Sequence, residues 1–173
     1  MELATIMEQK LNIFNRFYME NSLKNSLKQE NEYGYNLLYL DIDQFKLIND
    51  SAGYQAGDEL LKMIVSYFQT SLPTNASFAR VDGNGFMVLL SDSTQDDGKT
   101  FLQESLEKLK DFRFSHNNET FSVSASISLV YFKAFEYTLK ELLKASSTAL
   151  YTAKDKGRNK SHIYHKSDET IKR

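Results

Sequence analysis

The chain has 173 residues and a mass of 20.0 kDa, which is the size of one compact domain. It has no cysteine and three histidines, so a disulfide scaffold is excluded and little remains for a multi-histidine metal centre. The formal net charge of −2 argues against a nucleic-acid partner, and no stretch approaches the roughly 20 apolar residues of a membrane span. Because the N-terminus carries no secretory signal, we expect a cytoplasmic chain without direct membrane insertion.

The spacing of apolar residues predicts helices and strands in alternation. Apolar residues three or four apart over residues 2–28 indicate a helix, and the apolar run of residues 35–42 is typical of a buried strand. One helical turn is expected over residues 45–49. An amphipathic helix is expected over residues 58–72, and Pro73 ends it.

The second half of the chain begins with a predicted hairpin. Two strand-like runs, residues 76–81 and 86–90, flank the sequence Asp-Gly-Asn-Gly, which tolerates the positive φ angles of a tight turn. The remaining predicted elements are a helix over residues 100–109, a long strand over residues 120–132, a helix over residues 137–154 and an edge strand over residues 162–164.

This order of elements predicts a mixed α/β (α+β) fold. We expect a central, mostly antiparallel sheet of about five strands with helices on its faces. Residues 1–30 are interpreted as an N-terminal helical segment, residues 31–165 as the main domain and residues 166–173 as a charged tail or linker.

Carboxylates gather at the end of the first predicted strand. Tyr39, Asp41 and Asp43 share one face of that strand, because side chains alternate along it. Two carboxylates at a strand end are suitable ligands for Mg²⁺, which prefers oxygen. The other interpretation is a solvated strand end in which Asp43 caps the next helical turn, and the spacing alone favours it.

Several motifs, in one order along residues 8–165, resemble the GGDEF domain family, the diguanylate cyclases. Residues 41–58 resemble D-x-D-x-F-K-x-x-N-D-x-x-G-H-x-x-G-D, with Tyr54 in place of the usual histidine. Residues 148–159 resemble A-L-Y-x-A-K-x-x-G-R-N, residues 126–127 begin an S-I-G motif, and residues 15–16 match the N-R near the start of the family domain. The resemblance implies the nucleotidyl-cyclase-like palm fold and the conversion of two GTP molecules to cyclic di-GMP.

The signature motif itself departs from the family. The residues aligned with G-G-D/E-E-F are Asp82, Gly83, Asn84, Gly85 and Phe86. The resemblance implies that the third residue binds two Mg²⁺ ions together with Asp41 and the backbone carbonyl of Ile42, and that the acid in fourth place takes part in catalysis. Asn84 is neutral and Gly85 has no side chain, so we expect no intact catalytic set and a Mg²⁺ site of reduced affinity. The alternative, a displaced carboxylate from Asp82, is less favoured because a tight turn interrupts the strand alternation.

The residues that the resemblance assigns to the nucleotide are better preserved. It implies that Asn49 and Asp58 bind the guanine base, whose N–H donors a carboxylate can accept in pairs. Three cations would bind the phosphates: Lys46, Lys154 and Arg158. The family's inhibitory Arg-x-x-Asp aligns with Pro73, Thr74, Asn75 and Ala76. We therefore expect no inhibitory site for cyclic di-GMP.

The resemblance therefore implies a degenerate GGDEF domain that senses GTP or regulates a neighbour, with its cyclase activity lost. The named alternatives are a residual or atypical diguanylate cyclase and a protein-interaction or dimerisation module. The implied partners are GTP, an EAL-type phosphodiesterase domain or an upstream sensory domain, and a second copy in a homodimer. The chain would then be a piece of a GGDEF–EAL protein.

Overall fold

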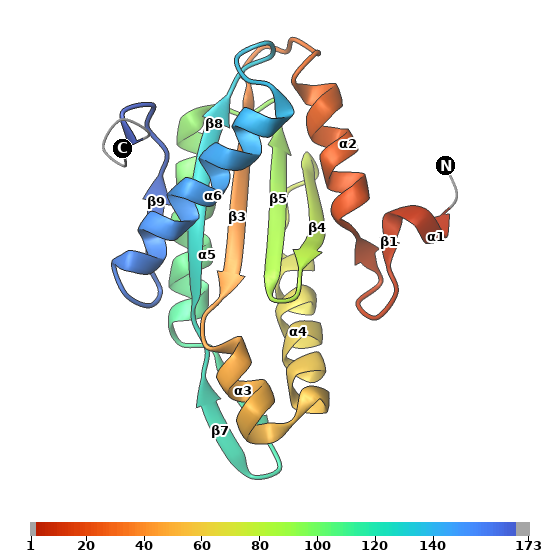
Figure 1. The fold of residues 1–173 in the computed structure, drawn as a ribbon, viewed down its shortest axis with the longest axis vertical. Coiled ribbons are helices and arrows are strands. Elements are labelled where there is room, and N and C mark those ends of the chain that lie inside the picture. Colours follow the sequence, from red (N-terminus) through yellow and green to blue (C-terminus); the bar gives the residue numbers. More distant parts are fainter. Residues whose placement is uncertain (1–2, 169–173) are drawn as a thin grey trace.

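A seven-stranded sheet forms the centre of the computed structural model, which describes residues 3–168 (Figure 1). The strands, in spatial order, are β1 (Met7–Glu8), β2 (Ile13–Phe14), β4 (Ala76–Asp82), β5 (Gly85–Ser91), β3 (Tyr35–Ile42), β8 (Ala125–Phe132) and β9 (Ser161–Ile163). The helices are α1 (Leu3–Ile6), α2 (Arg16–Ser26), α3 (Phe45–Ala52), α4 (Tyr54–Gln69), α5 (Gln95–Lys110) and α6 (Leu139–Asp155). A separate hairpin pairs β6 (Arg113–His116) with β7 (Glu119–Ser122).

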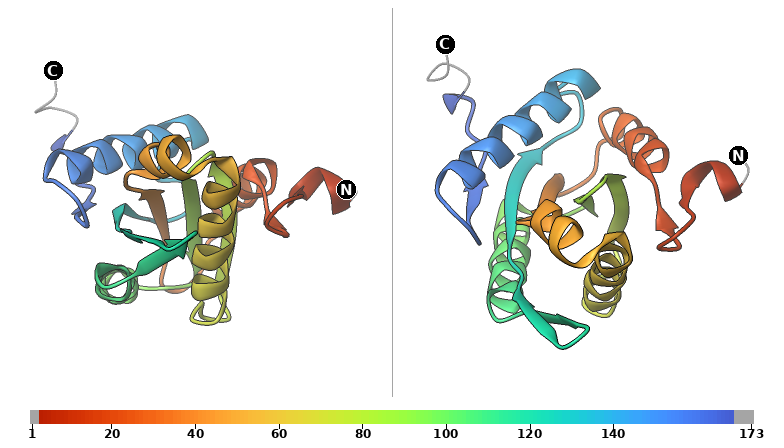
Figure 2. Two further views of the ribbon diagram at one scale, coloured as in Figure 1. Left: turned by 90° about the horizontal axis from the view of Figure 1, so that it is seen from below. Right: turned by 60° about the horizontal axis from the view of Figure 1, so that its bottom comes forward.

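Helices cover both faces of the sheet, as Figure 2 shows. Helices α4 and α5 pack on one face, against side chains of β3 that include Leu38 and Leu40. Helices α2 and α6 pack on the other face, against Tyr35 and Leu37. The central strand β3 is buried on both sides, which explains why its sequence is a continuous apolar run and not an alternating one.

The fold class and the mostly antiparallel sheet are confirmed, but the sheet has seven strands and not about five. The two added strands, β1 and β2, lie in the segment predicted as one helix over residues 2–28. There β1 and β2 pair as a short hairpin around Asn12, whose φ is 54°, and α2 begins only after Asn15. The Asn15 side chain accepts from the amide of Tyr18 (3.0 Å), which is the capping bond that starts α2.

The long strand predicted over residues 120–132 is divided in two. Strand β7 ends at Ser122, and β8 begins at Ala125. Between them the amide of Val123 donates to the Phe112 carbonyl (3.2 Å), which closes the base of the β6–β7 hairpin. Asn117 and Asn118, with φ of 48° and 68°, form the tip of that hairpin, a turn signal that the sequence interpretation did not use.

The other predicted elements are present, with bounds that differ from the expected ones by a few residues. The helical turn expected over residues 45–49 is the eight-residue helix α3. Helix α5 begins at Gln95, where a Thr94–Asp97 capping box satisfies its first turn. None of the helices within residues 3–168 is long and apolar enough to cross a membrane. The first two residues of the predicted N-terminal segment and residues 169–173 of the predicted tail lie outside the described residues.

The predicted hairpin brings its turn to the end of β3. Strands β4 and β5 are antiparallel and join at Asp82–Gly85, and Asp41 is the cross-strand partner of Gly85. The Ile42 amide donates to the Asn84 carbonyl (3.0 Å), which fixes the turn beside the C-terminal end of β3 (Figure 1). The signature motif and the carboxylates of β3 therefore lie together.

Candidate functional site

A cleft of about 450 Å³ lies at the C-terminal end of β3. Its lining comes from three segments of the chain: Asp41, Ile42, Asp43, Gln44, Phe45 and Lys46 from the end of β3 and the start of α3, Asn84 from the hairpin turn, and Lys154, Gly157 and Arg158 from the end of α6. Most of the residues singled out for metal and phosphate binding therefore line one cleft. Asn49 and Asp58, singled out for the base, are not among its lining residues.

Asp41 lies in this cleft with 8% of its surface exposed. Its Oδ2 atom forms an ion pair with the Lys154 ammonium group, and its Oδ1 atom is buried without a hydrogen-bond partner. Burial raises the pKa of the Asp41 carboxyl; Lys154 opposes that shift, and the carboxylates of Asp82 and Asp43 add to it. The net shift of the pKa is upward, so the ionised form of Asp41 lowers the stability of the fold.

Asp41→Asn is expected to stabilise the fold at neutral pH. A carboxyl whose pKa is higher in the folded state binds its proton more tightly there, so its contribution to stability is lost as pH rises above the ordinary value near 4. We expect a rise of about 2–4 °C in Tm at pH 7, equivalent to roughly 1 kcal/mol. The gain should shrink as the pH is lowered towards 4.

Scanning calorimetry of both proteins at pH 7 and near pH 4 measures this difference. The matched control is Asp50→Asn, because Asp50 is exposed on α3. A lower Tm for Asp41→Asn than for wild type at pH 7 would contradict the prediction.

Asp43 is held within the fold. Its carboxylate accepts hydrogen bonds from the Ser124 hydroxyl (2.8 Å), the Ser126 hydroxyl (2.8 Å) and the Asn159 amide (3.2 Å). Helix α3 begins after Gln44, which makes no side-chain capping bond, so the interpretation of Asp43 as a helix cap is wrong. Both oxygens of Asp43 are already occupied, and the structure does not present it beside Asp41 as a second free metal ligand.

The hairpin turn is fixed by polar contacts. The Asn84 side-chain amide donates to the Ile42 carbonyl (3.0 Å). The Arg80 guanidinium donates to the carbonyls of Gly83 (2.7 Å) and Asp82 (3.3 Å), and pairs with the Glu8 carboxylate (3.0 Å). The N-terminal hairpin therefore supports the signature turn through Glu8, a role that the predicted single helix would not allow.

The base candidates lie outside the lining of the cleft. The Asn49 Oδ1 atom is buried without a hydrogen-bond partner and lies close to Gly57, where any side chain would overlap with it. The Asp58 carboxylate forms an ion pair with the Lys10 ammonium group (3.3 Å), and both side chains are well exposed. The sequence interpretation missed Lys10, because it placed that residue in a helix and not at the tip of a hairpin.

The cationic candidates have different surroundings. Lys46 is exposed, Lys154 pairs with Asp41, and the Arg158 guanidinium contacts the side-chain oxygen of Gln44 in the amide orientation that satisfies both groups. Lys46, Lys154 and Arg158 surround the same cleft from α3 and from the end of α6. They are placed to meet an anion there, provided that Lys154 leaves Asp41.

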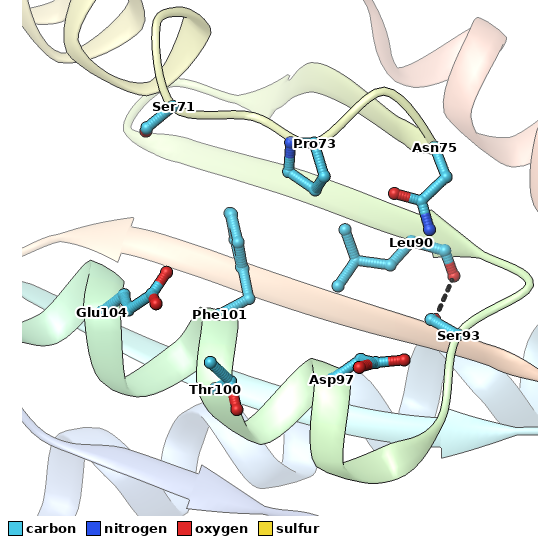
Figure 3. A pocket seen from close by; sticks show the side chains of 9 residues that line it. All are labelled: Ser71, Pro73, Asn75, Leu90, Ser93, Asp97, Thr100, Phe101 and Glu104. Atoms are coloured by element: carbon cyan, nitrogen blue, oxygen red, sulfur yellow. Dashed lines mark hydrogen bonds between the residues drawn. The ribbon is translucent and has the colours of Figure 1, made fainter.

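The segment aligned with the family's inhibitory motif borders a different cavity, of about 450 Å³, between the α4–β4 connection and α5 (Figure 3). Pro73 and Asn75 line it on one side, and Asp97 and Glu104 on the other. The Asn75 amide donates to the Ser91 carbonyl (2.7 Å), so this side chain is engaged with β5. All charged residues of the lining are acidic.

Comparison with known proteins gives a family match over residues 7–160, to "Diguanylate cyclase, GGDEF domain". The chain is 34% identical over 133 residues to the cyclic di-GMP phosphodiesterase PdeB of Shewanella oneidensis, covering 77% of this chain and 16% of that protein. It is 32% identical over 153 residues to the probable diguanylate cyclase DgcT of Escherichia coli, covering 86% of this chain and 33% of that protein. The chain thus spans a third or less of the length of these two relatives.

Solved structures agree with the sequence matches. The GGDEF domain of TpbB (YfiN) from Pseudomonas aeruginosa superposes with a TM-score of 0.84 at 25% identity, covering 95% of this chain and 98% of that one. Diguanylate cyclase SiaD from the same organism, solved with its activator SiaC, superposes with a TM-score of 0.85 at 25% identity, covering 92% of this chain and 62% of that one. With the family match extending over most of its length, the chain belongs to the GGDEF domain family.

Proposed function

We propose that this chain is a degenerate GGDEF module of cyclic di-GMP signalling that binds a guanine nucleotide and does not cyclise it efficiently. The observation that carries the proposal is the Asn84 amide, which donates to the Ile42 carbonyl (3.0 Å) in place of the acid that the family has there. The basic residues around the cleft are retained. Such a module would act as a GTP sensor or regulator for an attached domain.

The base would be recognised at the rim of the cleft. Guanine presents an N–H and an NH₂ group side by side, and a carboxylate accepts both. Asp58 offers that carboxylate, and the unpartnered Asn49 Oδ1 atom offers a further acceptor. The Lys10–Asp58 ion pair must open for this to happen. It is an exposed pair, for which the typical contribution is about 0–1 kcal/mol, so the cost is small.

The metal requirement explains the proposed loss of turnover. When bound, Mg²⁺ would neutralise phosphate charge and activate the attacking ribose hydroxyl. Asp41 would hold it through the free Oδ1 atom, with the Ile42 carbonyl as the second family ligand. These residues match the family's metal ligands only in part. The Ile42 carbonyl already accepts a hydrogen bond from the Asn84 amide, and Asn84 carries no negative charge. One cation site of lowered affinity is therefore expected where the family has two ions.

Asp58→Ala is expected to abolish the preference for GTP over ATP. Without the carboxylate, the N–H donors of guanine lose their acceptors, which costs about 1–3 kcal/mol, equivalent to roughly 5- to 150-fold in affinity. Binding of ATP should change little, since its base lacks that pair of donors. Calorimetric titration of wild type and variant with GTP and with ATP, each with Mg²⁺, measures both quantities.

The matched control for this titration is Asp96→Ala, which removes an exposed carboxylate from the first turn of α5. It should leave GTP affinity unchanged. If wild type does not bind GTP, or if Asp58→Ala keeps both the affinity and the preference, the nucleotide assignment is wrong. The module is then better interpreted as a protein-interaction or dimerisation domain.

The length of the relatives supports the proposal of an attached domain. Cyclic di-GMP phosphodiesterase PdeB is far longer than this chain, which covers 16% of it. We therefore propose that this module works beside another domain, either an EAL-type phosphodiesterase or an upstream sensor, in the cytoplasm. Residues 31–165 would form the module and residues 166–173 the start of a linker.

A second candidate function is residual cyclase activity. One observation favours it: the Asp82 carboxylate lies against Gly85, where the family has its fourth-position acid. Sensitive detection of cyclic di-GMP from GTP with Mn²⁺ separates the two candidates. Turnover approaching that of an intact family member would replace the proposed function with this one.

A further inference from the structure

The signature turn contains a reciprocal exchange of residue types. The family has glycine in first place and an acid in fourth place, whereas this chain has Asp82 first and Gly85 fourth. In the structure these two residues are direct partners across the β4–β5 hairpin. Directly opposed residues of an antiparallel pair have neighbouring side chains on one face of the sheet. This chain therefore carries an acid on β4, directly opposite the position on β5 where the family has one.

A β-bulge aims Asp82 towards Asp41. Regular alternation from the Arg80–Phe86 pair would put Asp82 on the face of Phe86, away from Asp41. The register shifts between Arg80 and Asp82, and bulges of this kind re-aim a side chain. The Asp82 carboxylate consequently accepts a hydrogen bond from the Tyr39 hydroxyl, and Tyr39 shares its face of β3 with Asp41.

The Asp82 carboxylate occupies the space of the missing side chain. A Cβ atom placed on Gly85 would overlap with one Asp82 carboxylate oxygen and would lie 2.7 Å from its Cγ atom. Gly85 is also the cross-strand partner of Asp41. Three neighbouring strands thus present Asp82, a glycine and Asp41 in one row, and the Asp82 carboxylate reaches over the glycine towards the strand of Asp41.

Asp41 provides the second, independent feature. It is more than nine-tenths buried, and its Oδ1 atom has no hydrogen-bond partner. Its other oxygen is neutralised by Lys154. Burying a carboxylate oxygen without a hydrogen-bond donor destabilises the fold, unless a bound cation or a donor interacts with that oxygen.

We propose that Asp82 supplies, from β4, the carboxylate that position 85 lacks, so that Asp41 and Asp82 together bind one divalent cation of the Mg²⁺ or Mn²⁺ class. Mg²⁺ sites commonly use one or two carboxylates and complete their octahedron with water and phosphate oxygens. The cation would take the free Oδ1 atom of Asp41. Only the contribution of nucleotide phosphates rests on the proposed function; the two carboxylates bind the cation without it.

Mn²⁺ alone is the probe that tests this site. In ¹H–¹⁵N spectra of the whole chain, paramagnetic Mn²⁺ should broaden the amide signals of residues 41–43 and 82–86 first. Asp82→Asn should raise the Mn²⁺ concentration needed for this by at least about tenfold, because loss of even a supporting group commonly costs 10–100-fold in metal affinity. The same spectra report whether the variant is folded.

The control and the rescue use the same titration. Asp96→Asn changes an exposed residue of α5, and its amide signals should broaden with Mn²⁺ as those of wild type do. Asp82→Gly should lose the response, and Asp82→Gly combined with Gly85→Asp should regain it, because an acid at position 85 lies directly across the sheet from Asp41. Equal broadening in wild type and Asp82→Asn, or none near Asp41 in wild type, would overturn the proposal.

The outcome is separable from that of the proposed function. If GTP does not bind but Mn²⁺ broadens residues around Asp41 and Asp82, the nucleotide module fails and the cation site stands. If GTP binds and the Mn²⁺ response is insensitive to Asp82→Asn, the cation site fails and nucleotide binding stands.

Discussion

A variant carrying Asp82→Gly, Asn84→Asp and Gly85→Glu is expected to form cyclic di-GMP from GTP, whereas the wild-type chain should form almost none. The three changes restore the family's signature on a hairpin that already has the required position beside β3. Removing one preorganised group that stabilises charge typically costs about 10²–10³ in rate. Restoring the third-position acid and the fourth-position acid should therefore raise turnover by at least about 10²-fold.

Changing Asn84 and Gly85 without Asp82 should restore less. The space beyond the Gly85 Cα atom is filled by the Asp82 carboxylate, so a new glutamate there would overlap with it. It would also place a third negative group beside Asp41 and Asp82, where like charges disfavour ionisation. We expect the double variant to turn over more slowly than the triple variant, which separates a steric and electrostatic conflict from a simple lack of acids.

The assay is the amount of cyclic di-GMP formed from GTP with Mg²⁺ and, separately, with Mn²⁺. Protein concentrations should be high enough for two copies to meet, because two GTP molecules combine in the product. Adding Asp41→Asn to the triple variant is the control, and it should remove the restored activity. A triple variant that folds and binds GTP but stays as inactive as wild type would show that the loss lies outside the signature.

The sequence was most informative where local chemistry alone determines the structure. The Asp-Gly-Asn-Gly stretch predicted the tight turn, and the continuous apolar run predicted the central strand, since both depend on nearest neighbours. The family resemblance then predicted that the turn would lie beside Asp41. The Asp41–Gly85 pairing agrees with this expectation.

What the sequence could not predict depends on register and on contacts distant in the chain. Apolar spacing over residues 2–28 is compatible with one helix, and only the pairing of β2 with β4 makes a hairpin there the better arrangement. The Lys10–Asp58 ion pair depends on that hairpin. The direction of Asp82 depends on a bulge, and regular alternation gives the wrong face.

Asp43 illustrates the same limit at a single carboxylate. The sequence pattern groups Asp43 with Asp41 as a candidate metal ligand and, alternatively, makes it a candidate helix cap. In the structure it joins three segments, since it directly follows β3 and accepts from Ser124 before β8, from Ser126 in β8 and from the Asn159 amide after α6. These donors come from residues more than 80 positions away, which no local pattern reveals.

Asp43→Ala is therefore expected to lower the free energy of unfolding by about 2–4 kcal/mol. Hydrogen bonds to a charged group are worth about 1.5–3 kcal/mol each, and the partly buried donors left behind add a desolvation cost. Urea unfolding followed by circular dichroism measures the change. Asp50→Ala, on the exposed side of α3, is the matched control and should stay within about 0.5 kcal/mol of wild type. If both variants unfold at the wild-type midpoint, Asp43 does not hold these segments together, and its carboxylate is free to serve the cleft beside Asp41.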